Sequence, residues 1–356
     1  MSRQLFNLAD KVIEFTKKFG EVESEVVIKK NNDITVEARK EKIEFSEVSH
    51  STSISLRVIH NNKSALVSTS SSSESNLKKL ASKAIEIAKD SLENPYDIIA
   101  QNFEFADSSK IKNLEIFDIK TNEYKNTLFF EELAISADKA SLHDDKITNT
   151  DGSSAGRSVS EYILCTSNGF SDGYKRSSFY ISSSAIAAEN KKMEREFAFE
   201  QRTHLEDLPN PSEIGELAAE RALSILGATK PTTGNYPVIF NERISSSIIG
   251  HILSAINAET IIRGSSWLLK NLNKNIIPEK YSLIEDPHLF RLSGSRPFDA
   301  EGLKTKKNKF IDQGVLKSWV MDLKTSSQLG LKSTANAIRS NSSLPYPGVG
   351  NIELVG

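Results

Sequence analysis

The most constraining feature of the sequence is a series of short segments near its start in which apolar and polar residues alternate. Ile34, Val36 and Ala38, for example, fall on one side of an extended chain, as expected for a β-strand with one buried face. Asparagine-rich stretches at 31–33 and 61–63 separate the segments and predict turns. The pattern therefore predicts an antiparallel meander with one buried face. Its strands are expected at residues 24–30, 34–39, 43–48, 53–60 and 65–69.

Helical patterns flank this meander and complete a first domain at residues 1–105. Apolar residues recur at helical spacing over 4–19 and again over 77–88. Asn94-Pro95 is expected to end the second helix, because the residue before a proline disfavours the helical conformation.

A second domain is expected at residues 112–228, where a β-hairpin with its turn at 168–173 is followed by a well-marked helix. Asn210 is predicted as the N-cap of this helix, Pro211 as its first residue and Gly227 as its C-terminal stop. The other elements expected here are a helix at 129–142, a loop at 143–156 and strands at 157–166, 174–187 and 195–203.

A linker at 229–235, rich in threonine, glycine and proline, leads into a third domain. This domain, 229–356, is expected to begin with a strand at 236–240 and a helix at 242–258, followed by several strand-like segments. The residues thus indicate an α+β protein of three domains.

Composition argues against nucleic-acid and membrane partners. The chain has 45 basic and 47 acidic residues, and its net charge of −2 predicts no basic surface. No apolar run approaches the roughly 18 residues of a membrane span, and charged residues interrupt any signal peptide. The single cysteine, Cys165, cannot form an intrachain disulfide and is expected to be a buried thiol. We therefore expect a cytoplasmic protein.

Two candidate nucleophiles lack the surroundings that catalysis requires. Residues 152–156 satisfy the pattern G-x-S-x-G, which functions only at a sharp turn between a strand and a helix. The flanking residues here predict a loop and a strand, so a flexible turn is favoured. Cys165 lies in a strand pattern without a neighbour that would activate its thiol, which favours core packing.

The residues do not identify a metal site or an acid–base pair. No two of the six histidines lie four or five residues apart, so no helix presents a histidine pair to a metal. His143-Asp144-Asp145 is interpreted as a solvated loop rather than a weak cation site. Asp299 and Glu301 share a face of an extended segment, where they could catalyse proton transfer, bind a hard cation or anchor loops.

An ordered series of motifs gives more information than any single residue. Residues 234–240 and 250–256 are followed by Phe-Asp-Ala-Glu-Gly at 298–302, and shorter motifs stand at 55–58 and 167–170. This series resembles the TldD/PmbA family of two-component metalloproteases, whose C-terminal domain carries a Phe-Asp-x-Glu-Gly signature. The resemblance covers nearly the whole chain.

The resemblance also indicates a branch of this family. In the TldD branch, a helix of the third domain carries H-E-x-x-x-H, whose histidines bind zinc and whose glutamate acts as the general base. In this chain Ser246 and Ser247 match the first histidine and the glutamate, and His251 matches the second histidine. Serine is a poor zinc ligand and cannot replace a carboxylate base. The resemblance therefore implies the TldE/PmbA branch, with no catalytic residue and no metal on this chain, and with His251 in the core or at an interface.

The implied function is that of a subunit in a heteromeric metalloprotease that cleaves unfolded proteins or peptides. A TldD-like partner would supply zinc and the base, and this chain would shape a shared chamber. Asp299 and Glu301 are candidate lining residues of that chamber. One alternative is a non-enzymatic peptide-binding or regulatory protein of the same fold, in line with the family's description as a modulator of DNA gyrase. Autonomous hydrolysis through Asp299 and Glu301 ranks last.

For the fold, the resemblance implies a mixed α/β N-terminal half with antiparallel sheets and a mostly β C-terminal domain. The family's domain continues beyond the position that matches Gly356, so the third domain is expected to be incomplete and truncated at its C-terminus. In TldD that further part supplies the third zinc ligand, a cysteine. The family's Ser-Thr-Gly-Asn reads Ser-Thr-Ala-Asn at 333–336, and the Cβ of Ala335 argues against a positive φ there.

Overall fold

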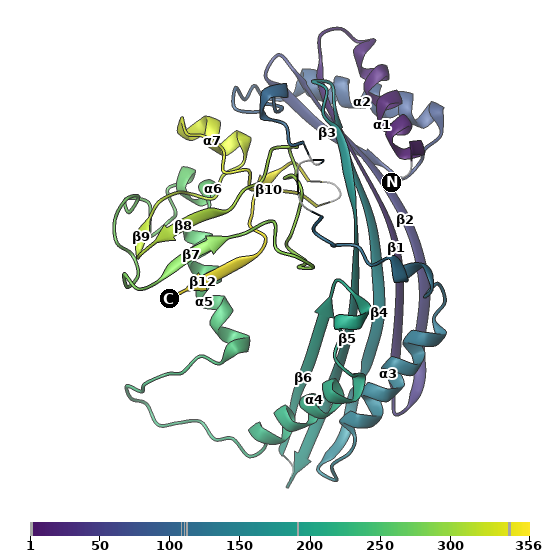
Figure 1. The fold of residues 1–356 in the computed structure, drawn as a ribbon, viewed down its shortest axis with the longest axis vertical. Helices are drawn as coiled ribbons and strands as arrows, with labels where there is room; N and C mark the ends of the chain where they lie inside the picture. The colour runs from purple at the N-terminus through teal and green to yellow at the C-terminus, as the bar shows by residue number, and fades with distance from the viewer. Residues whose placement is uncertain (1–2, 108, 110, 112, 191, 341–342) are drawn as a thin grey trace.

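A computed structural model describes residues 3–107, 109, 111, 113–190, 192–340 and 343–356. Its largest element is a curved six-stranded antiparallel sheet with the strand order β3-β2-β1-β4-β5-β6. Helices cover the convex face of the sheet, and the C-terminal domain lies on the concave side (Figure 1). The strands are β1 (Glu23–Arg39), β2 (Lys42–His60), β3 (Lys63–Thr69), β4 (Ile147–Thr166), β5 (Ser171–Glu189) and β6 (Lys192–Arg202).

Strand β1 joins the two N-terminal regions of the chain into this one sheet. It pairs with β2 on one side and with β4 on the other, so that Val26 lies opposite both Leu56 and Cys165. Because neighbouring residues of a strand point to opposite faces, the even-numbered residues of β1 face the helices and the odd-numbered residues face the C-terminal domain.

Part of the predicted turn pattern is wrong. The stretch 31–33 lies inside β1, where its backbone pairs with strands on both sides, and this pairing outweighs the turn preference of its side chains. The first turn occurs instead at Lys40 and Glu41, with φ of 52° and 58° and without the usual asparagine or glycine. The second predicted turn is confirmed at Asn61 and Asn62, which have φ of 51° and 58°.

The helices pack on the convex face as two pairs, each over its own apolar cluster. Helices α1 (Arg3–Lys17) and α2 (Glu74–Asp90) cover one end of the sheet. Helices α3 (Leu128–Ser141) and α4 (Pro211–Ile225) cover the other end. The sequence predicted a helix at each of these four places, and it marked the start of α4 with an N-cap residue and a proline.

Helix α4 approaches α3 closely at Gly215. A Cβ at this position would overlap the carbonyl oxygen of Ala137 in α3. The predicted start of α4 is confirmed: the Asn210 side chain accepts a hydrogen bond of 3.1 Å from the backbone N–H of Ser212, and Pro211 is the first helical residue.

The predicted loop at 143–156 is wrong over most of its length, because β4 begins at Ile147. The Gly/Ser-rich stretch 152–156 is therefore not a flexible turn but a paired strand, with Ser153 and Ser154 opposite Ser183 and Ser182 of β5. This location also lacks the strand–turn–helix geometry of a serine hydrolase. Cys165 is buried in the same strand.

The C-terminal domain is built around a small antiparallel sheet with the order β12-β7-β8-β9. Its apolar core includes Leu283, Phe310 and Trp319. The α+β fold class is confirmed. The elements of the C-terminal domain are α5 (Glu242–Ala255), α6 (Ala258–Ile262), β7 (Ser282–Glu285), β8 (Asn308–Asp312), β9 (Val315–Leu316), α7 (Leu323–Leu329), β10 (Ala337–Ile338), β11 (Tyr346–Pro347) and β12 (Ile352–Val355).

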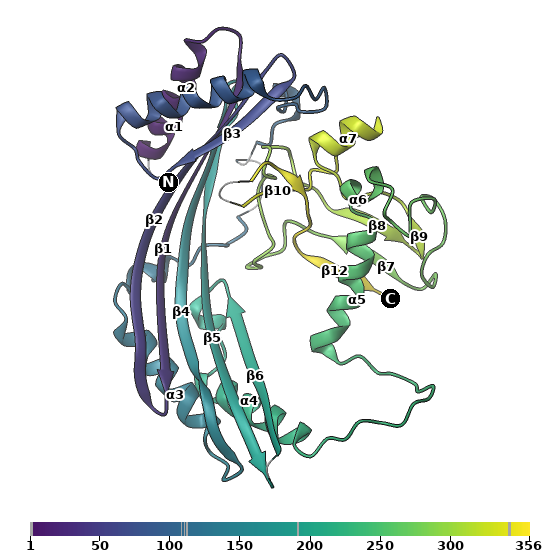
Figure 2. The same cartoon turned by 180° about the vertical axis from the view of Figure 1, so that it is seen from behind.

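The strand predicted at 236–240 does not form. This segment is extended but pairs with no strand of the described chain, and its side chains are exposed, with Ile239 at 96%. A strand needs a neighbour to satisfy its backbone groups, and a short run of apolar residues alone does not supply one. Figure 2 shows the long connection that carries this segment from α4 to α5. No helix in the described part of the chain has the length and apolar character needed to cross a bilayer.

Candidate functional site

Helix α5 carries the three positions that match the zinc motif of the TldD branch. Asn241 caps it by accepting a hydrogen bond of 3.2 Å from the backbone N–H of Ile244. Ser246, Ser247 and His251 are all exposed to solvent. Of the two locations expected for His251, the structure does not place it in the core, because Ala255 is the only buried residue of this helix. Its location at an interface stays a prediction.

These side chains do not fit a zinc ion. The hydroxyl of Ser247 donates to the carbonyl oxygen of Ile244 within the helix, at 2.6 Å. His251 is the one good zinc donor among the three positions, and a structural or catalytic zinc site needs at least three protein ligands. Across the described residues, no three histidine, cysteine, aspartate or glutamate side chains come together as a metal site.

The start of the C-terminal domain exposes apolar surface next to these positions. Tyr236, Val238 and Phe240 are between 51% and 67% exposed, and Ile244 of α5 is 54% exposed. Large contiguous apolar surface is uncommon on a protein that stays alone in solution. The segment that leads into α5 and the first turn of this helix therefore expose several large apolar side chains to solvent.

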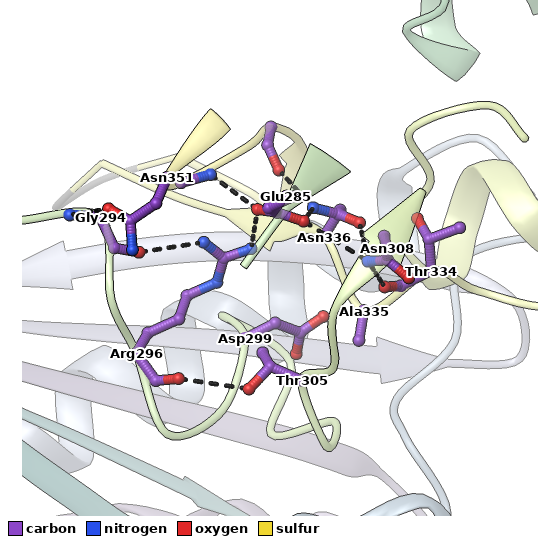
Figure 3. Close-up of polar contacts among 12 residues, drawn as sticks. Glu285, Gly294, Arg296, Asp299, Thr305, Asn308, Thr334, Ala335, Asn336 and Asn351 are labelled. Atoms are coloured by element: carbon purple, nitrogen blue, oxygen red, sulfur yellow. Dashed lines mark hydrogen bonds and ion pairs between the residues drawn. The ribbon is translucent and has the colours of Figure 1, made fainter. Parts of the chain in front are cut away.

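A buried polar network forms the centre of the C-terminal domain (Figure 3). The carboxylate of Glu285, at the end of β7, accepts from the guanidinium of Arg296 at 3.0 Å and from the backbone N–H of Gly350 at 2.7 Å. It also accepts from the side-chain amides of Asn336 at 2.6 Å and Asn308 at 3.4 Å. Glu285 is fully buried, so these donors compensate for its lost hydration. The network ties the end of β7 to the start of β8 and to the loops that carry Arg296, Asn336 and Gly350.

Asp299 acts in this structure as an anchor for its own loop. Its carboxylate accepts backbone N–H groups from Glu301 and Leu303 at 2.9 Å and from Ala337 at 3.2 Å. Burial raises the pKa of Asp299 to about 6, although these hydrogen bonds favour the charged form. Three backbone donors leave this carboxylate little capacity for a substrate.

Glu301 lies at a boundary between the C-terminal domain and the large sheet. Its side chain is 2% exposed and accepts the backbone N–H of Leu323 at 2.9 Å. Burial and the neighbouring charges of Asp299 and Asp322 raise the pKa of Glu301 well above its ordinary value of 4.5. It borders a cavity of about 360 Å³ that Arg57 also lines. A role of Asp299 and Glu301 in lining a substrate chamber stays a prediction.

Two ion-pair groups connect the sheet to the C-terminal domain. Glu25 of β1 pairs with Arg339 at 2.7 Å, and both side chains are at most 4% exposed. Asp97, in the segment after α2, pairs with Lys324 of α7 at 2.8 Å and lies 4.0 Å from Arg57 of β2. These contacts fix the C-terminal domain on the concave face of the sheet.

Sequence reasoning missed most of these residues. Glu25 and Arg339 carry no local signal in the sequence, because their contact joins residues near opposite ends of the chain. The expectation about Ala335 is wrong: its φ is 56°, in the left-handed region, although it has a Cβ. The contacts of Thr334 and Asn336 on either side hold this residue in place.

Comparison with known proteins agrees with this architecture. Residues 24–88 match domain 1 of the PmbA/TldA metallopeptidases, residues 120–226 match their central domain, and residues 233–355 match their C-terminal domain. The chain therefore belongs to the PmbA/TldD metallopeptidase family.

Relatives and solved structures extend this match. The chain is 31% identical to metalloprotease PmbA of Escherichia coli O157:H7 over 315 residues, which are 88% of this chain and 69% of that protein. It is 30% identical to a metalloprotease PmbA homologue of Haemophilus influenzae over 331 residues, 91% of this chain and 71% of that protein.

The fold is shared with two crystal structures of lower sequence identity. A protein of Bacteroides thetaiotaomicron, named as a candidate modulator of DNA gyrase, has a TM-score of 0.90 at 23% identity, covering 99% of this chain and 77% of that one. TldE of Thermococcus kodakarensis has a TM-score of 0.78 at 20% identity, covering 98% and 77%.

Proposed function

We propose that this chain is the metal-free, TldE/PmbA-like subunit of a heteromeric metalloprotease in the cytoplasm. A partner of the same family, with an intact H-E-x-x-x-H helix, supplies the zinc ion and the glutamate base that cleave unfolded proteins or peptides. The observation that carries the proposal is the chemistry of α5, where Ser246 and Ser247 occupy the positions of a zinc ligand and a base.

The exposed surface around α5 supports an assembly. Val238, Ile239 and Phe240 precede the helix with exposed fractions from 51% to 96%, and Ile244 and Ile248 extend the apolar surface along it. Covering such side chains removes apolar area from water at about 25 cal/mol per Å². The chain spans 69% to 77% of the relatives and structures named above. The apolar surface around α5 could therefore be covered by a further segment of this fold, by a partner subunit, or by both.

The concave face of the sheet supports a role in holding substrate. Ser154 and Ser158 of β4 lie opposite Ser182 and Ser178 of β5 on this face, and all four are partly exposed. Hydroxyl groups on this face can donate and accept hydrogen bonds, which an apolar core could not do. The face can therefore bind the backbone of an extended polypeptide without selecting its side chains.

A second candidate function is a non-enzymatic peptide-binding or regulatory protein. The name of the Bacteroides thetaiotaomicron structure, a candidate modulator of DNA gyrase, favours it. This function would use the same concave face but no metal-bearing partner.

A peptidase assay distinguishes the two functions. An unstructured, fluorogenic peptide is incubated with this chain, with the TldD-branch paralogue from the same genome, and with both, each with zinc and with a chelator. We expect chelator-sensitive cleavage only in the mixture. Cleavage by this chain alone would overturn the metal-free assignment, and binding without cleavage in every preparation would favour the regulatory protein.

Two variants sharpen this assay. His251→Ala in this chain is expected to leave cleavage by the mixture unchanged, since His251 is not a zinc ligand in the proposal. Replacing the motif glutamate of the partner with glutamine is expected to abolish cleavage, because the base is lost. If His251→Ala abolishes cleavage while the complex still assembles, this histidine belongs to the metal site and the proposal is wrong.

A further inference from the structure

A cavity of about 340 Å³ lies between the concave face of the sheet and the loops of the C-terminal domain. Lys29 of β1 and Arg176 of β5 line its sheet wall, and Arg296 and Arg339 line its opposite wall. No aspartate or glutamate of the described chain is among the residues that line it. Among the described residues that line the cavity, every charged side chain is therefore cationic.

Two of these cations are already neutralised and two are not. Arg296 pairs with Glu285 at 3.0 Å, and Arg339 pairs with Glu25 at 2.7 Å. Lys29 forms no ion pair with a described residue, so its charge remains available.

Arg176 is the second cation without a carboxylate. Its guanidinium donates to the backbone carbonyl oxygens of Ser293 and of Ser295, the latter at 2.6 Å, and no described carboxylate pairs with it. Lys29 lies opposite Tyr162, and Arg176 lies opposite Ser160, two residues away on the same face of β4. Both cations thus project from one face of the sheet toward the cavity.

Buried donors without acceptors give an independent indication of a ligand. The hydroxyl of Tyr162 and the Nε–H groups of Arg296 and Arg339 are buried and have no hydrogen-bond partner. The two arginine side chains are only 8% and 4% exposed. Burial raises the pKa of Tyr162, so its hydroxyl keeps its proton. Unsatisfied buried donors are rare because each carries a desolvation penalty, and an anion in the cavity would supply acceptors.

The cavity also has an apolar wall. Val27, Phe298, Ile338 and Val349 line it together with the cationic groups. Its volume of about 340 Å³ lies at the small end of the range for ligand pockets, which is roughly 300–1,000 Å³. An inorganic anion would use the cations but not the apolar side chains. The C-terminal residue of a peptide offers a carboxylate next to an apolar side chain and would use both.

We propose that this cavity binds the carboxylate of a peptide, with the free C-terminus as its source, and that Lys29 and Arg176 provide the charge that recognises it. The choice of a peptide as ligand rests on the proposed function. The site itself belongs to this chain alone and requires neither zinc nor the partner.

The test measures peptide binding to the isolated chain by fluorescence anisotropy, in the absence of any partner. Three labelled unstructured peptides differ only at their ends: one ends in leucine with a free carboxylate, the second is its C-terminal amide, and the third is an amide with glutamate as its last residue. Because a charge-assisted contact is lost, we expect the leucine amide to bind about tenfold more weakly than the free acid.

Lys29→Gln provides the matched variant, because this side chain makes no structural ion pair. It is expected to reduce the preference for the free acid to about twofold or less. Lys30→Gln is its control. Lys30 is the next residue of β1, and its side chain points to the opposite face of the sheet. The control is expected to keep the full preference.

Each result has a defined meaning. Loss of the preference in Lys29→Gln with retention in Lys30→Gln supports the site. Equal binding of the free acid and the leucine amide by the wild-type chain overturns it, and so does an unchanged preference in Lys29→Gln. Binding of the glutamate amide as tightly as the free acid would show that a side-chain carboxylate serves equally well, and would overturn the free C-terminus as the source. Because the assay uses no zinc and no partner, a negative result here leaves the cleavage assay, and with it the proposed function, standing.

Discussion

Removal of Arg339 should destabilise the C-terminal domain strongly, because it leaves a buried charge without its partner. Arg339 and Glu25 form an ion pair of 2.7 Å between the C-terminal domain and β1, with side chains 4% and 1% exposed. The guanidinium also donates to the carbonyl oxygen of Ala300 at 2.6 Å. The perturbation is Arg339→Met, which keeps the volume of the side chain and removes its charge and its donors.

The expected magnitude follows from this burial. Breaking a buried ion pair by removing one partner costs about 3–5 kcal/mol, most of it the penalty for the remaining charge. The double variant Glu25→Leu with Arg339→Met removes both charges, and such replacements are often close to neutral. We therefore expect the double variant to be about 2–4 kcal/mol more stable than Arg339→Met alone.

Urea unfolding followed by tryptophan fluorescence measures this difference. The only two tryptophans of the chain, Trp267 and Trp319, both lie in the C-terminal domain, and Trp319 is 4% exposed. Circular dichroism, which the large sheet dominates, shows whether both parts unfold together. A loss below about 1 kcal/mol for Arg339→Met, or a double variant no more stable than the single one, would refute the reasoning.

Three further predictions concern single residues. The pKa of Glu301 is raised in the folded state above its ordinary value of 4.5, so the free energy of unfolding falls as the pH rises from 4.5 through the raised pKa. In urea unfolding between pH 5 and 9, the free energy of unfolding of Glu301→Gln should therefore depend less on pH than that of the wild type. Ala335→Gly should change the free energy of unfolding by less than about 1 kcal/mol, because relief of the positive φ offsets the loss of the methyl group. Ala337→Gly is the control: this buried alanine has no positive φ to relieve, so the substitution should cost about 1.5 kcal/mol in the same measurement. Gly215→Ala should lower the melting temperature, because its Cβ overlaps α3 at a cost of about 1–3 kcal/mol, whereas Gly250→Ala in α5 meets no atom and should leave it unchanged or raise it.

The helices of this protein are encoded locally, which is why they could be predicted. The N-cap Asn210, the following Pro211 and an apolar stripe mark α4 within a single stretch of the sequence. Strands are different, because their limits depend on neighbours. The asparagine-rich stretch 31–33 is a strand only because β2 and β4 pair with it on both sides, and the apolar segment 236–240 is unpaired because no described strand lies beside it.

The same contrast applies to the candidate site. The positions Ser246, Ser247 and His251 could be assigned from the order of family motifs, and the structure places them on one exposed helix. The pairing of Glu25 with Arg339 could not be predicted, because these residues are more than 300 positions apart and neither has a distinctive neighbour. The cationic cavity likewise exists only where the C-terminal domain meets the sheet.

The zinc content of the purified proteins tests the central claim most directly. This chain, its TldD-branch paralogue and their complex are dialysed against metal-free buffer, and bound zinc is measured by mass spectrometry. We expect zinc in the paralogue and in the complex, and less than about one zinc per ten copies in this chain alone, because α5 lacks a ligand set. One tightly bound zinc per copy of this chain, lost on replacing His251 with alanine, would contradict the assignment of the metal to the partner.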